Sequence, residues 1–80
     1  MSYIFSFSSR NGALRFYDAV RANGISATLV NTPISGSGCG LSVKTTDYDG
    51  CKGVLMRGSF SSFTSAYMFD GQKYITIFDD

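Results

Sequence analysis

Apolar and polar side chains alternate along residues 3–7, YIFSF, as they do in a β-strand with one buried face. Tyr3, Phe5 and Phe7 fall on one side of such a strand, and Ile4 and Ser6 fall on the other. The polar stretch SSRNG follows and predicts a turn. The chain therefore begins with a short strand.

The apolar period changes to that of a helix over residues 10–23, RNGALRFYDAVRAN. Ser8 or Ser9 is expected as the N-cap, and Gly24 as the residue after the C-cap. Leu14 is the one large apolar side chain on the polar sector. The apolar sector consists of Ala13, Phe16, Tyr17 and Val20. This pattern predicts an amphipathic helix that packs on a sheet.

Four strands and a second helix complete the predicted order. Thr46 or Asp47 is expected to cap this second helix, and Thr46 with Asp49 resembles a capping box. Asp70 and Gly71 are typical of a hairpin turn. The predicted ranges are strands over 25–31, 41–44, 66–69 and 73–78, and a helix over 47–57.

This order predicts an α+β domain, a ferredoxin-like sandwich with an antiparallel sheet and two helices on one face. The crossover rule makes the first two strands parallel and inserts the third strand between them. The connection between the strands over 25–31 and 41–44 then lies near the turn of residues 8–12. We expect residues 1–80 to form a single domain.

Composition narrows the possible chemistry. The net charge of +1 gives no electrostatic reason to bind nucleic acid or a membrane. The chain has no histidine, which excludes a Cys–His catalytic pair, and we expect neither a metal site nor a cofactor. The N-terminus lacks the pattern of a signal peptide, and no segment approaches the ~18 apolar residues of a membrane span. We therefore expect a cytoplasmic location.

The candidate chemistry lies in the segment PISGSGCGL, residues 33–41, which places Cys39 between two glycines. Backbone N–H groups near Gly38 and Gly40, and the hydroxyl group of Ser37, could stabilise an anion such as a thiolate. Arg10, at the start of the first helix, could add positive charge on topological grounds. Each effect would lower the pKa of Cys39 below its usual value of about 8.5. A loop cysteine of this kind can equally be an inert, small buried side chain.

The same residues resemble a known family. The chain resembles the family described as "Putative Se/S carrier protein-like". The resemblance lies in the strand YIFSF, the helix that follows it, and Pro33, Ile34, Ser35, Cys39, Gly40 and Leu41. These are small bacterial domains, also found as the C-terminal part of YedF-like proteins. The resemblance covers about residues 3–48 and implies that Cys39 carries sulfur or selenium, as a persulfide or selenosulfide, between a donor protein and an acceptor protein.

Several alternatives stay open at this level. The chain could be a non-catalytic regulatory module that binds a small anion or a protein. Cys51 is expected to be buried in the second helix, with no disulfide to Cys39. The aromatic side chains of residues 3–7 could stack on RNA bases, but the basic aromatic motif of RNA-binding domains is missing from LSVK, residues 41–44. They could instead close a homodimer, joined by Tyr74, Thr76 and Phe78.

Overall fold

The computed structural model describes residues 1–32 and 40–79 of the chain. Its elements are β1 (Ser2–Phe7), α1 (Arg10–Ala22), β2 (Ala27–Asn31), β3 (Leu41–Thr45), α2 (Tyr48–Arg57), β4 (Phe63–Phe69) and β5 (Tyr74–Asp79). All seven predicted elements are confirmed. The largest difference is at β4, which begins three residues before the predicted strand of residues 66–69.

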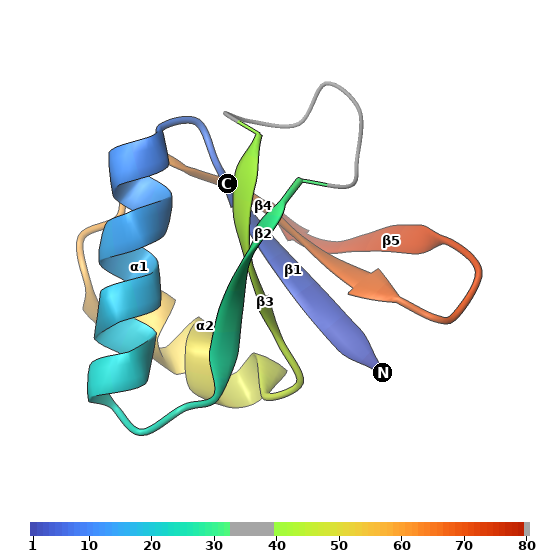
Figure 1. Cartoon of the computed structure of the whole chain (residues 1–80), viewed down its shortest axis with the longest axis horizontal. Coiled ribbons are helices and arrows are strands. Elements are labelled where there is room, and N and C mark those ends of the chain that lie inside the picture. The colour runs from blue at the N-terminus through green and yellow to red at the C-terminus, as the bar shows by residue number, and fades with distance from the viewer. Residues whose placement is uncertain (33–39, 80) are drawn as a thin grey trace.

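The five strands form one antiparallel sheet in the order β2-β3-β1-β4-β5. Both helices cover the same face of this sheet, and the β4–β5 hairpin extends away from them (Figure 1). The first four strands have the ferredoxin-like order, with β3 between β1 and β2, and β5 adds an edge strand beside β4. The predicted fold class and the predicted place of the third strand are confirmed.

Polar side chains fix where each helix begins. The Ser9 hydroxyl group accepts a hydrogen bond from the N–H of Gly12 at 2.9 Å, so Ser9 is the N-cap of α1. The Asp47 carboxylate accepts one from the N–H of Gly50 at 3.0 Å and caps α2. Asp47 rather than Thr46 is therefore the cap, and the capping box predicted for Thr46 and Asp49 is wrong because the cap lies one residue later. Gly24 has the expected positive φ, +76°.

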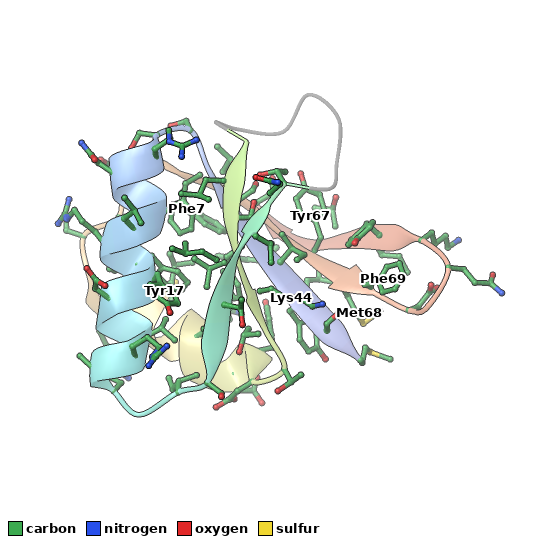
Figure 2. All side chains as sticks on the ribbon, in the orientation of Figure 1. Phe7, Tyr17, Lys44, Tyr67, Met68 and Phe69 are labelled. Carbon is green, nitrogen blue, oxygen red and sulfur yellow. The ribbon has the colours of Figure 1, made fainter. Side chains whose placement is uncertain are left out.

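Aromatic side chains fill the space between the helices and the sheet. The Phe16 ring on α1 lies 5.3 Å from the Phe5 ring and 5.2 Å from the Phe7 ring, and all three side chains are fully buried. Phe7 and Tyr17 lie between α1 and the strands (Figure 2). Tyr3, Phe5 and Phe7 thus share the helix-covered face. The two alternatives in which these three side chains form an open surface, for RNA bases or for a second copy, are wrong, because the side chains pack against the helices as part of the core.

The opposite face carries no helix among the described residues. Ile4 lies in its middle, directly across from Lys44 and Tyr67 on the neighbouring strands. A register shift between Ala66 and Tyr67 adds one residue to β5, so that Phe78 pairs with Ala66 on the helix-covered face. Phe78 stacks there on Phe63 at 5.6 Å. Thr76 pairs with Tyr67 on the opposite face, and Tyr74 lies on that face too, so the interpretation that all three residues join the face of Phe5 is confirmed for Phe78 and wrong for the other two.

Candidate functional site

The candidate site is at the end of the sheet where β1 finishes and α1 begins. Ser42 of β3 lies opposite Ser6 of β1, and the same register continued by two residues brings Gly40 level with Ser8. The residues that flank the cysteine-bearing segment are joined, since the N–H of Thr32 donates to the carbonyl oxygen of Gly40 at 2.8 Å. Ser37, Gly38 and Cys39 lie outside the described residues, whereas Gly40 and Arg10 lie within them.

The N-terminus of α1 provides positive potential at this end. Arg10 is its first residue and is exposed, and the first turn contains no acidic residue. The N–H groups of a first helical turn have no partner inside the helix, and they carry a partial positive charge. The Ser9 hydroxyl group accepts from the N–H of Gly12, and the Ser9 carbonyl oxygen accepts from the N–H of Ala13, which leaves the N–H groups of Arg10 and Asn11 at the end of the helix. This terminus therefore favours a nearby anion over a cation.

Gly40 has a backbone conformation that favours glycine. Its φ is +90°, and among the described residues no heavy atom beyond its chain neighbours lies within 4 Å of the position where a Cβ would be. Conformation rather than crowding therefore demands glycine here. Gly40 directs the chain into β3, so the geometry immediately after Cys39 depends on this residue.

Paired hydroxyl groups line the helix-free side of the same end. The Thr32 and Ser42 hydroxyl oxygens are 2.6 Å apart, and those of Ser6 and Thr64 are 2.7 Å apart. Ser6 and Ser42 are fully buried and face each other across β1 and β3. Sequence reasoning missed this row, although small hydroxyl residues at the alternate positions of two strands were a signal that could have found it.

The connection between α2 and β4 lies against the start of α1. The N–H of Ser8 donates to the carbonyl oxygen of Ser62 at 2.7 Å. Gly12 lies against the same residue, and a Cβ at position 12 would overlap the Ser62 hydroxyl oxygen. The contact between Gly12 and Ser62 joins residues fifty positions apart, and no pattern in the sequence predicts it.

Cys51 is a different kind of cysteine. It lies in the first half of α2, which follows the end of β3 that is remote from Gly40, and its side chain is fully buried, as predicted. Burial raises the pKa of the Cys51 thiol, a hydrogen bond with Thr45 opposes that rise, and the Asp47 carboxylate adds to it. Cys51 is therefore held as the neutral thiol, a poor nucleophile.

Within residues 1–32 and 40–79, no three His, Cys, Asp or Glu side chains gather as metal ligands would. Neither α1 nor α2 has the length and apolar character of a membrane-spanning helix.

The chain matches one protein family over residues 2–60, which is more than half of its length. That family is described as "Putative Se/S carrier protein-like". The chain belongs to this family. The matched range of the Se/S carrier-like domain includes β1, α1, β2, β3 and α2, together with Arg10 and Cys39, and it ends before β4. Curated proteins and solved structures gave no match.

Proposed function

We propose that this Se/S carrier-like domain transfers sulfur or selenium between proteins through Cys39. The observation that carries the proposal is the family match, whose range contains Cys39. The exposed Arg10 and the N-terminus of α1, which has no acidic residue in its first turn, support it by favouring a nearby anion. The raised pKa of Cys51 also supports it, since that thiol is unsuited to the role.

In the proposed reaction, the Cys39 thiolate attacks the outer sulfur of a persulfide on a donor protein. A new S–S bond forms as the S–S bond of the donor breaks, and the donor leaves as a thiolate. The outer sulfur keeps its proton, so the domain holds a Cys39 persulfide. An acceptor thiolate then attacks that outer sulfur and releases Cys39 as a thiolate. The selenium form follows the same steps with a selenosulfide, and neither needs an external oxidant.

The other candidate residues have supporting roles in this proposal. Ser37 and the backbone near Gly38 and Gly40 would donate hydrogen bonds to the thiolate or to the persulfide anion. Arg10 would stabilise the same charge over a longer range. Transfer of this kind would take place between cytoplasmic proteins. Association of two copies stays a prediction, which analytical ultracentrifugation would test.

A non-catalytic module that binds a small anion is the second candidate. The positive end of α1 favours it, because a helix N-terminus stabilises an anion whether or not a thiol is present. The two functions differ in their need for Cys39. Cys39→Ser would abolish sulfur transfer and leave anion binding nearly unchanged.

The test is the rate of alkylation of Cys39 against pH, measured by site-resolved mass spectrometry with Cys51 as the internal control. A carrier is expected to label fast, with a midpoint below about pH 8.5. Incubation with a donor persulfide should then add one sulfur atom to wild type and none to Cys39→Ser. A midpoint at or above that value, or labelling no faster than at Cys51, would reject the carrier function.

A further inference from the structure

An apolar groove lies between the C-terminal end of α2, the connection to β4, and β5. Its volume is about 300 Å³, and the rings of Phe60, Phe63 and Phe78 line it together with Leu55 and Met56. Met56 is 64% exposed at its edge. Flexible thioether side chains are frequent on surfaces that bind peptides, since they adapt to the shape of the ligand. None of these residues belongs to the candidate carrier site.

Close packing holds the central ring of this groove. Phe60 lies edge-on to Phe16 of the core at 5.3 Å, and a Cβ at Gly58 would overlap the Phe60 ring. Gly58 has a φ of −94°, so glycine is required here by the approach of the ring and not by its backbone conformation. A second hollow of about 210 Å³ adjoins the groove and shares Gly58 and Phe60 with it. The ring therefore stands between two hollows.

The charged side chains that contact this surface are cations, within the part of the chain that the structure describes. The Lys52 ammonium group lies 4.8 Å from the centre of the Phe78 ring, and the Arg15 guanidinium group lies 5.9 Å from that of Phe60. Arg57 lines the adjoining hollow, while Asp18 and Asp49 line neither. The whole chain has a net charge of only +1, so this positive rim is local.

We propose that this groove binds a segment of a partner protein in which an apolar side chain is flanked by carboxylates. The apolar side chain would enter between Met56 and the Phe60 ring, and the carboxylates would meet Lys52, Arg15 and Arg57. An apolar anchor within a charged rim is the usual arrangement of a peptide-binding groove. The proposal does not depend on the thiol chemistry of Cys39, and either can fail alone.

The experiment is an amide-shift titration of the full ¹⁵N-labelled chain with short synthetic peptides. The probes carry one Phe, Leu, Ile or Met between Asp and Glu residues, and the comparison peptides have Lys in place of every acidic residue. At least one acidic peptide should shift the amide signals of Met56, Ser59 and Phe60, and its basic counterpart should not bind. The affinity should fall as salt is added, because charges at an exposed rim are screened.

A matched pair of double variants separates the rim from overall charge. Lys52→Gln with Arg57→Gln should weaken binding of the acidic peptide about tenfold at low salt. Lys44→Gln with Lys73→Gln removes the same charge away from the groove and should bind as wild type does. The proposal would be overturned if both double variants lost the same affinity, if acidic and basic peptides bound equally, or if the shifts were confined to the helix-free face. It would also be overturned if no acidic peptide bound. Shifts of the groove amides that depend on protein concentration without peptide would overturn it too, because they would show that a second copy of the chain occupies the groove.

Discussion

Gly12, in the first turn of α1, packs directly against the side chain of Ser62 in the connection between α2 and β4. A Cβ at position 12 would also approach the hydroxyl oxygen of Ser9, the N-cap of the helix, to 3.0 Å. The absence of a side chain lets the connection lie close to the start of α1, where the N–H of Ser8 donates to the carbonyl oxygen of Ser62. Gly12 therefore helps to shape the end of the domain that carries the candidate site.

Gly12→Ala should lower the free energy of unfolding by about 1–2 kcal/mol, although alanine is the better helix former, because Ser62 and the cap must shift. Gly53→Ala in α2 is the control. There a Cβ would meet the end of the Arg57 side chain, which can move, and a gain of about 0.5–1 kcal/mol is expected. Guanidinium unfolding measures both. Equal effects at the two positions would show that the contact with Ser62 does not matter.

Asp47 should contribute to stability as the cap of α2. Asp47→Ala removes the acceptor for the N–H of Gly50 and should cost about 1 kcal/mol. Thr46→Ala is the matched control and should change the free energy of unfolding by less than about 0.5 kcal/mol. Thermal or chemical unfolding of the two variants checks this, and a larger loss at Thr46 would contradict the assignment of the cap.

The raised pKa of Cys51 predicts a pH dependence of stability. The folded state holds the thiol proton more tightly than the unfolded chain does. This contribution is complete below about pH 8.5, the pKa of an unfolded cysteine, and it is lost as the pH rises toward the higher folded value. The free energy of unfolding should therefore fall above about pH 8.5 more steeply in Cys39→Ser than in the double variant Cys39→Ser with Cys51→Ala. Parallel slopes for the two would show that Cys51 titrates normally.

Arg10 should influence the reactivity of Cys39 if the two lie at the same end of the sheet. Arg10→Gln is expected to raise the alkylation midpoint of Cys39 by about 0.2–0.5 pH units, a small effect because an exposed charge is screened. Arg21→Gln, in the last turn of α1, removes the same charge at the far end of the helix and should leave the midpoint unchanged. An unchanged midpoint in Arg10→Gln as well would remove Arg10 from the proposed site.

Only part of the candidate site could be predicted from the sequence. The glycine-flanked Cys39 is visible there, and the crossover rule was enough to bring its flanking residues Thr32 and Gly40 to the end of β1. The contact of Gly12 with Ser62 could not be predicted, because it joins distant segments through backbone and hydroxyl atoms that leave no periodic pattern. The basic rim of the groove could not be predicted either, because Arg15 comes from α1 whereas Lys52 and Arg57 come from α2, and these helices are distant in the chain.

The order and type of the elements follow from local patterns in the sequence. Alternation marked β1, the helical period marked α1, and Asp70 with Gly71 marked the hairpin turn, where Gly71 has a φ of +100°. These signals are local, because side-chain period and turn geometry depend on neighbouring residues only. Packing between distant segments sets which face of the sheet the helices cover and which residues of β5 point toward it. The extra residue in β5 turns Phe78 toward Phe63 and the core, a choice set by packing against strands and helices distant in the chain.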